Sequence, residues 1–174
     1  MKKSVLIITF AVIAFVGGLS VRGLLSSLLD KAKQENQNPL PEFSLPDLSG
    51  KQHNIKKWQG KILVINFWAT WCPPCLKEMP EFAAMQNEFS EKGLQFIGIA
   101  LDDLEPVKEF TASHKITYPI LMGEDQGTKL AHNLGNIVNT VPFTVIVNQK
   151  GQIIKRHMGT LTREELLKIV TPLF

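Results

Sequence analysis

The chain has 174 residues, of which 44% are hydrophobic and 20% charged, the composition of an ordinary globular protein with room for one domain. Its formal net charge of +3 is small, and its lysines and arginines are scattered rather than gathered in a stripe with aromatic residues, which argues against a nucleic-acid partner. It has only two cysteines, separated by two residues.

The first 29 residues predict a membrane anchor. Two lysines precede an uncharged, mostly apolar run of 18 residues at 4–21, which as a helix could cross most of a bilayer core of roughly 30 Å. The small residues Gly18 and Ser20 leave open the alternative of a cleavable signal peptide. We favour the anchor because the run exceeds a signal-peptide core of about 7 to 15 residues and because leucines prolong it.

Residues 30–41 are polar, follow no apolar period and end in two prolines. They are therefore predicted to tether a domain at 42–174 to the anchor. We expect this domain to begin with a short hairpin whose turn lies at 47–50.

Strands and helices alternate after the hairpin. Nearly continuous apolar runs at 61–69 and 94–101 predict strands that are buried on both faces of a sheet. Between them, apolar residues recur at helical spacing from Pro73 to Gly93, and Pro80 is expected to kink this helix. Further helices and a short strand are predicted at 105–114, 118–122 (the strand) and 128–134.

The C-terminal part predicts an antiparallel hairpin over 143–159, followed by a last helix. Thr162 and Glu165 match the capping box that begins such a helix. Alternating strands and helices that end in a hairpin and a helix indicate a three-layer α/β domain, with a central mixed sheet flanked by helices.

The cysteines lie in the segment WATWCPPC, between the first buried strand and the helix that follows. The N-terminus of a helix stabilises a thiolate at Cys72, while Cys75 lies one turn deeper. Cys72 would attack a partner's disulfide, and Cys75 would resolve the mixed disulfide. The chemistry predicted for this pair is therefore thiol-disulfide exchange.

Two other interpretations of the pair are weaker. A structural disulfide that closes so short a loop stabilises a protein by only about 2 kcal/mol, and a domain of this size can build a core without it. A zinc site needs two further ligands at recognisable spacing. The four histidines are not paired with other ligands in the sequence: His53, His114, His132 and His157.

Two segments resemble a known family. LVINFWATWCPPCLKEMPEF is similar to the active-site segment of thioredoxin-fold proteins, and specifically of TlpA/ResA-type membrane-anchored thiol-disulfide oxidoreductases. NTVPFTVIVNQKGQIIKRHMG resembles their segment with the active-site cis-proline. The resemblance covers roughly residues 41–174 and implies a thioredoxin-like fold. It also implies a single-pass protein of the cytoplasmic membrane, with its catalytic domain in the periplasm or outside the cell.

The resemblance also implies the partners of the protein. The substrates would be disulfide-bearing exported proteins, such as apocytochromes c with their haem-attachment cysteines. Electrons would come from a transmembrane thiol carrier, and no cofactor or metal is expected. The reaction would then be protein-disulfide reduction.

The resemblance places Val141 and Pro142 beside the cysteines, with Pro142 in the cis form. A cis proline lacks a backbone donor and exposes the backbone of the preceding residue, where an extended substrate segment could pair. The alternative is an ordinary turn proline before a strand.

One position departs from the thioredoxin pattern. Thioredoxins usually carry a buried aspartate six positions before the first cysteine, which accepts the proton of the second thiol, and this chain has Asn66 there. Glu78, three residues after Cys75 on the same helix face, is the candidate replacement. The alternative is a solvated helix glutamate, and Glu81, on a different face, serves as the negative control.

The residues around the cysteines suggest a redox direction. If Cys72 caps the helix, Pro74 removes the N–H donor at the second helical position. A thiolate with fewer donors has a pKa nearer about 7 than about 3.5, and its protein has a reducing potential, closer to about −270 mV than −120 mV.

Further residues beside the cysteines are expected to bind the substrate. Trp71, Pro73, Pro74 and Val141 are expected to contact it, while Trp68 belongs to the core. Asp102 and Asp103, which follow the second strand, are interpreted as caps of the next helix rather than catalytic acids.

Three alternative functions use related chemistry. A peroxide reductase of this fold would need proline and Ser/Thr where Ile65 and Ala69 stand. A copper-binding assembly factor would use the two cysteines and a distant histidine, but with a longer spacing between the cysteines. A disulfide oxidase or isomerase would use the same dithiol at a more oxidising potential.

Overall fold

The computed structural model describes residues 38–174. The anchor predicted at 1–29 and most of the tether predicted at 30–41 lie outside the described residues. Within residues 38–174, the structure has no helix that is both long and apolar enough to span a membrane.

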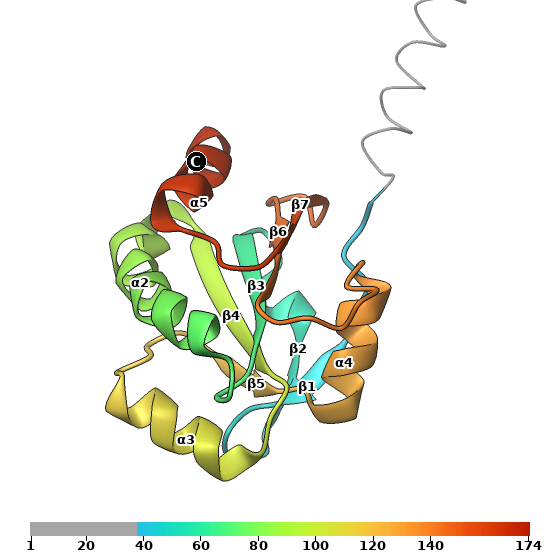
Figure 1. The fold of residues 1–174 in the computed structure, drawn as a ribbon. Coiled ribbons are helices and arrows are strands. Elements are labelled where there is room, and N and C mark those ends of the chain that lie inside the picture. Colours follow the sequence, from blue (N-terminus) through green and yellow to red (C-terminus); the bar gives the residue numbers. More distant parts are fainter. Residues whose placement is uncertain (1–37) are drawn as a thin grey trace, which may run out of the picture. The chain divides into compact units, whose positions relative to one another are not determined.

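A five-stranded mixed sheet forms the centre of the structure, in the order β5-β4-β3-β6-β7 (Figure 1). Its strands are β3 (Ile62–Trp68), β4 (Leu94–Ala100), β5 (Ile120–Met122), β6 (Phe143–Val147) and β7 (Ile153–Met158). β3, β4 and β5 are parallel, whereas β6 and β7 run antiparallel to their neighbours. Every residue of β3 and β4 is buried, which confirms the prediction from their continuous apolar runs.

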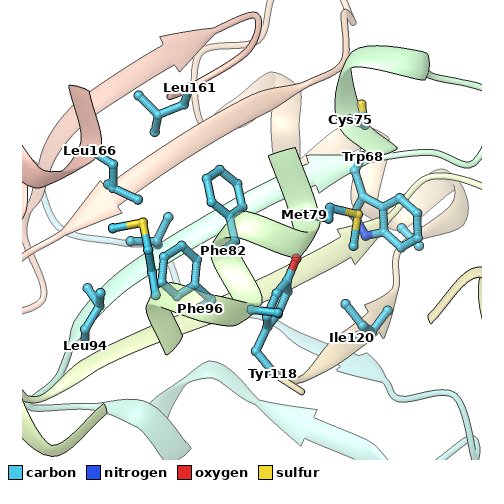
Figure 2. Packing of buried hydrophobic residues seen from close by; sticks show 14 of the residues in the cluster. Trp68, Cys75, Met79, Phe82, Leu94, Phe96, Tyr118, Ile120, Leu161 and Leu166 are labelled. Atoms are coloured by element: carbon cyan, nitrogen blue, oxygen red, sulfur yellow. The ribbon is translucent and has the colours of Figure 1, made fainter. Parts of the chain in front are cut away.

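Within residues 38–174, four α-helices cover the two faces of this sheet (Figure 1). They are α2 (Pro73–Phe89), α3 (Leu104–Ser113), α4 (Glu124–Asn133) and α5 (Arg163–Val170). The side chains of α2, α3 and α5 belong to one apolar cluster, shown in part in Figure 2, which includes Trp68 of β3. α4 contributes to the cluster on the other face, which includes the neighbouring residue Phe67. The alternation of side chains along a strand thus separates the two cores.

The predicted N-terminal hairpin is present as β1 (Ser44–Pro46) and β2 (Gln52–Asn54). Its turn is held by the Asp47 carboxylate, which accepts a hydrogen bond from the backbone N–H of Ser49 at 2.8 Å. Short 3₁₀ turns occur at Ile55–Trp58, Ser90–Lys92 and Thr171–Leu173.

Two helix boundaries differ by more than two residues from the sequence-based expectation. α2 ends at Phe89, and Gly93, at a φ of 87°, closes the 3₁₀ turn between α2 and β4. α4 begins at Glu124 rather than at residue 128. Its first core-facing position is Gly127, where a Cβ would lie 2.7 Å from Leu101 Cδ2, so no apolar side chain marks this turn in the sequence.

The residues just before β1 also pair with the rest of the structure. Pro39–Phe174 groups into one compact unit. The backbone N–H of Leu40 donates to the carbonyl of Gly151 at 2.9 Å, and Pro39 pairs with Gln152. The last residues of the predicted tether therefore pair with the turn between β6 and β7.

The sheet register brings three loops together at the carboxyl ends of β3 and β4. Phe67 of β3 lies opposite Phe143 of β6, so the cysteine segment after β3 and Pro142 before β6 meet at the same end of this strand pair. Ala100, the last residue of β4, pairs with Trp68, which places the start of the Asp102 loop at that end too. The carboxyl ends of β3 and β4 therefore define the site.

Candidate active site

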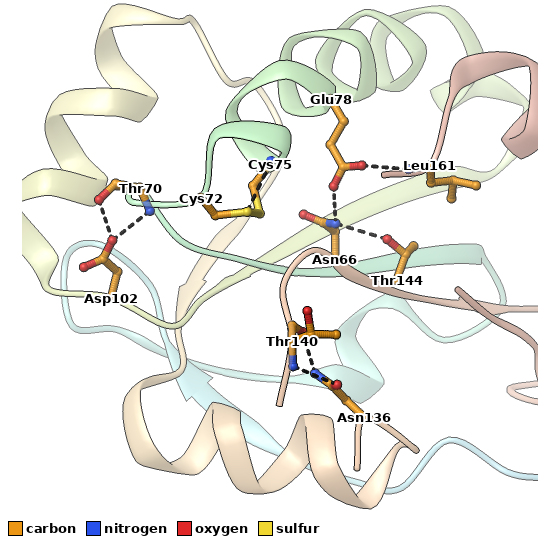
Figure 3. Close-up of a disulfide and its surroundings, with 10 residues drawn as sticks. All are labelled: Asn66, Thr70, Cys72, Cys75, Glu78, Asp102, Asn136, Thr140, Thr144 and Leu161. Atoms are coloured by element: carbon orange, nitrogen blue, oxygen red, sulfur yellow. Dashed lines mark hydrogen bonds between the residues drawn. A yellow bond between two sulfur atoms is a disulfide. The ribbon is translucent and has the colours of Figure 1, made fainter. Parts of the chain in front are cut away.

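Cys72 and Cys75 form a disulfide at the N-terminus of α2 (Figure 3). Cys72 is the N-cap residue, and its Sγ accepts a hydrogen bond from the backbone N–H of Cys75 at 3.4 Å. Pro73 and Pro74 occupy the first two helical positions and have no N–H to offer. The predicted cap is thus confirmed: Cys75 supplies the N–H donor, and Pro74 supplies none.

The disulfide is shielded from solvent, although the residue before it is not. Cys72 is 3% exposed and Cys75 is fully buried, whereas Trp71 is 67% exposed. Trp68 is fully buried and packs on Phe110, with ring centroids 5.4 Å apart. The expected division between a core tryptophan and an exposed tryptophan is confirmed.

Glu78 is a buried carboxylate one helical turn after Cys75. It is 4% exposed, so the alternative of a solvated helix glutamate is wrong, whereas Glu81 is exposed. Its Oε2 accepts the backbone N–H of Leu161 at 2.9 Å, and its Oε1 accepts Nδ2 of Asn66 at 2.9 Å (Figure 3). Burial raises the pKa of Glu78 to about 7, although these two hydrogen bonds oppose the rise. The side chain can therefore exchange a proton near neutral pH.

Two partners of this carboxylate were missed by the sequence analysis. The sequence pattern presents Asn66 only as a residue that cannot accept a proton, yet Asn66 donates to Glu78 and, at 3.1 Å, to Thr144 Oγ1. Leu161 donates through its backbone, so its side chain gives no indication of the contact. A polar residue inside an apolar strand was the one available signal, present both at Asn66 in β3 and at Thr144 in β6.

A second carboxylate holds the cysteine loop from the other side. Asp102 Oδ2 accepts the backbone N–H of Thr70 at 2.7 Å and also its hydroxyl, and Oδ1 accepts the N–H of Asp103 at 2.8 Å. The expectation that both aspartates cap α3 is wrong for Asp102, and Asp103 occupies the N-cap position without a side-chain cap bond. Local sequence predicts a cap because Asp102 lies just before the helix. Its actual partner, Thr70, comes near only through the pairing of β3 with β4, which the local sequence does not indicate.

The peptide bond between Val141 and Pro142 is cis, as the resemblance implies. The carbonyl of Pro142 accepts the N–H of Gly159 at 2.9 Å. Upstream, the side chain of the buried Asn136 bonds both backbone groups of Thr140, at 2.7 Å to its carbonyl and 3.1 Å from its N–H. No motif in the sequence indicates Asn136. The substrate-binding roles expected for Trp71, Pro73, Pro74 and Val141 stay predictions.

The arrangement supports exchange of two electrons between this dithiol and another disulfide. It places Cys72 at a helix N-terminus, next to the exposed Trp71, and a buried carboxylate, Glu78, close to Cys75 in the chain. Within residues 38–174, the structure has no group of three or more His, Cys, Asp and Glu side chains arranged to hold a metal ion.

Comparison with known proteins adds independent information. A family described as Redoxin matches residues 35–170. Thiol-disulfide oxidoreductase ResA of Bacillus thuringiensis (strain Al Hakam) is 30% identical over 99% of this chain and 100% of that protein. Thioredoxin-like protein YneN of Bacillus subtilis (strain 168) is 36% identical over 76% of each chain. The crystal structure of a thiol:disulfide interchange protein from Chlorobium tepidum TLS superposes with a TM-score of 0.72 and 27% identity, covering 78% of this chain and 95% of that one.

Proposed function

We propose a function for this chain from the premise that it belongs to the Redoxin family, with the thioredoxin-like fold and the dithiol of a thiol-disulfide oxidoreductase. The chain is tethered to the cytoplasmic membrane by its N-terminal segment. Its domain lies outside the cytoplasm and reduces disulfides of exported proteins. Apocytochromes c, whose haem-attachment cysteines must be reduced, are the substrates that we propose.

The single observation that carries the direction of the reaction is the cap of α2. Cys72 Sγ accepts one backbone N–H, that of Cys75, and Pro74 leaves the second helical position without a donor. A thiolate with fewer donors is less stabilised, which makes the reduced protein the better electron donor. The geometry thus favours a reductase over a strong disulfide oxidase.

The reaction proceeds in two exchanges. The Cys72 thiolate attacks one sulfur of the substrate disulfide, forming a mixed disulfide and releasing the other substrate sulfur as a thiolate. Cys75 then loses its proton to Glu78, and its thiolate attacks Cys72 Sγ. The second substrate sulfur leaves, so the substrate gains two electrons and the protein ends as the Cys72–Cys75 disulfide. Glu78 suits this step because burial raises its pKa to about 7.

The tether and location are supported by the sequence at the N-terminus. An uncharged run of 18 residues follows two lysines. The alignment with ResA of Bacillus thuringiensis spans 99% of this chain, so the similarity extends through this segment. Re-reduction of the oxidised protein requires a thiol donor, which we assign to a transmembrane thiol carrier.

The reduction potential of the full chain tests this proposal. The protein is equilibrated with glutathione or dithiothreitol buffers under metal-free conditions, and the fraction of disulfide is followed by tryptophan fluorescence. We expect a potential near the roughly −270 mV of thioredoxin. A potential near about −120 mV would make the protein a disulfide donor instead.

A further inference from the structure

Asn66 sits at the centre of the buried polar group beside the disulfide. It is 1% exposed, and both hydrogens of its amide are used: Nδ2 donates to Glu78 Oε1 at 2.9 Å and to Thr144 Oγ1 at 3.1 Å. Its carbonyl Oδ1 is also buried and has no hydrogen-bond partner within residues 38–174. The amide therefore satisfies its donors and leaves its acceptor unpaired.

This orientation has a physical reason. An unpaired buried acceptor is costly, so the amide would turn over if its donors gained nothing from their present partners. Turning would place Oδ1 against a carboxylate oxygen of Glu78, two acceptors facing each other. A hydrogen bond from an N–H to a carboxylate is about twice as strong as one between neutral groups, which outweighs the unpaired carbonyl.

Both donors to Glu78 favour its ionised form. Leu161 N–H donates to Oε2 and Asn66 Nδ2 donates to Oε1, so each carboxylate oxygen accepts a hydrogen bond from an N–H group. A protonated Glu78 would have to direct its O–H at one of these N–H groups. Burial works in the opposite direction, because it favours the neutral acid.

We propose that Asn66 is a positioning residue that holds the Glu78 carboxylate in place and favours its ionised form, the form that can take the Cys75 proton. The inference rests on the proposed role of Glu78 as that acceptor. It also means that Asn66 and Glu78 act as one amide–carboxylate pair. The double substitution Asn66→Asp with Glu78→Gln would exchange the amide and the carboxylate. It would preserve the hydrogen bond from an N–H to a carboxylate, the bond from Leu161 and the buried negative charge.

The other titratable groups near Glu78 do not replace this effect. Burial, and then the charge of Glu78, raise the pKa of Tyr118, so this buried phenol stays neutral in the working range. Cys72 and Cys75 titrate only when the disulfide is reduced, and they are the reacting groups themselves. Glu81 of the same helix is exposed and makes a matched control.

The experiment separates the two exchanges in time. The reduced full chain is mixed with an equimolar amount of dithiobis-nitrobenzoate, a disulfide that releases a yellow thiolate at each exchange. The first release reports the attack by Cys72, and the second reports the attack of Cys75 on Cys72 Sγ. Both rates are measured from pH 5 to pH 9 in stopped flow.

We expect Glu78→Gln to slow the second release by about 100-fold without changing the first. Asn66→Leu removes a donor to a charged group and should move the pH midpoint of the second release upward by about one to two pH units. Asn66→Asp and Glu78→Gln together should restore the second release to within about tenfold of the unsubstituted protein. Glu81→Gln should leave both phases unchanged.

The outcomes distinguish the inference from the proposed function. If Glu78→Gln leaves the second release unchanged, Glu78 is not the proton acceptor, and the inference fails together with that step of the proposed reaction, whereas the proposed reductase function still depends on the measured potential. If Glu78→Gln slows it but Asn66→Leu keeps the original pH midpoint, only the inference is overturned. If Asn66→Leu does not fold, the nearly isosteric double variant Asn66→Asp with Glu78→Gln decides. If its second release is no faster than that of Glu78→Gln alone, Asn66 and Glu78 do not act as one amide–carboxylate pair.

Discussion

Two carboxylates flank the disulfide loop, and their pKa values are shifted in opposite directions. We call the side of the loop at Glu78 the inner side and the side at Asp102 and Thr70 the outer side. On the inner side, Glu78 is 4% exposed and accepts two hydrogen bonds, and burial prevails, raising its pKa to about 7. On the outer side, burial also raises the pKa of Asp102, but bonds from Thr70 and Asp103 outweigh it, and the pKa falls below its ordinary value. The depth of burial therefore decides which carboxylate can exchange a proton.

The difference assigns distinct tasks to the two sides. Glu78 can act as a base near neutral pH, whereas Asp102 stays ionised and fixes the backbone two residues before Cys72. The two sulfurs follow the same division, because Cys75 is fully buried near Glu78 in the chain and Cys72 caps the helix next to the exposed Trp71. We therefore expect proton transfer on the inner side and substrate contact on the outer side.

Replacing one cysteine at a time should have the largest effect on disulfide exchange. Cys75→Ser should attack a disulfide probe and stop at the mixed disulfide, because no second thiol resolves it. Cys72→Ser should react far more slowly, since the Cys75 thiol is fully buried and, unlike Cys72, does not cap the helix N-terminus. Mass spectrometry of the adducts measures both. Equal reactivity of the two variants would erase the distinction between inner and outer sulfur.

Substituting Glu78 should change how stability depends on pH. A carboxylate whose pKa rises from 4.5 unfolded to about 7 folded binds more protons in the folded state, so the free energy of unfolding falls as pH rises through this window. The loss is about 3 kcal/mol between pH 4.5 and 7 and stays constant above it. In Glu78→Gln this loss should vanish.

Chemical denaturation of the oxidised protein at pH 5 and pH 8 measures this effect. Glu81→Gln, on the exposed face of α2, should retain the full pH dependence of the unsubstituted protein. If Glu78→Gln also retained it, another group would account for the pH dependence and the inner carboxylate would not be the perturbed one.

Restoring a donor on the outer side should shift the redox potential. Pro74→Ala provides an N–H at the second helical position, where Cys72 Sγ can accept it. The thiolate should become more stable, with a lower Cys72 pKa and a potential about 30 to 60 mV more oxidising. Equilibration with glutathione measures the shift. An unchanged potential would show that the missing donor does not set the redox direction.

Among these substitutions, Asp102→Asn should have the smallest effect, a modest loss of stability without slower resolution by Cys75. The amide can still accept the Thr70 bonds but lacks the charge, so we expect a loss of stability of about 1 kcal/mol. Because the folded pKa of Asp102 is lowered, its contribution is present above the unfolded pKa and is lost as pH falls through the folded pKa. Denaturation at pH 7 and pH 3 checks this, with Asp103→Asn as control. Slower resolution by Cys75 in Asp102→Asn would contradict the division of tasks.

Local features of the structure followed from the sequence because short-range physics governs them. The continuous apolar runs predicted β3 and β4, and the capping box predicted the start of α5, where both reciprocal bonds of Thr162 and Glu165 are present. The Cys-x-x-Cys spacing and its two prolines predicted the cap of α2. The start of α4 escaped prediction because Gly127 faces the core without a side chain.

The sequence by itself thus determined the elements, the dithiol and its position at a helix N-terminus, because each depends on residues within a few positions of one another. Only the tertiary structure decided which groups surround the carboxylates. Glu78 meets Leu161 across 83 positions, Asn66 meets Thr144 across 78, and Asp102 meets Thr70 across 32. Strand order and helix packing create these contacts, and they set the depth of burial that separates a proton acceptor from a fixed charge.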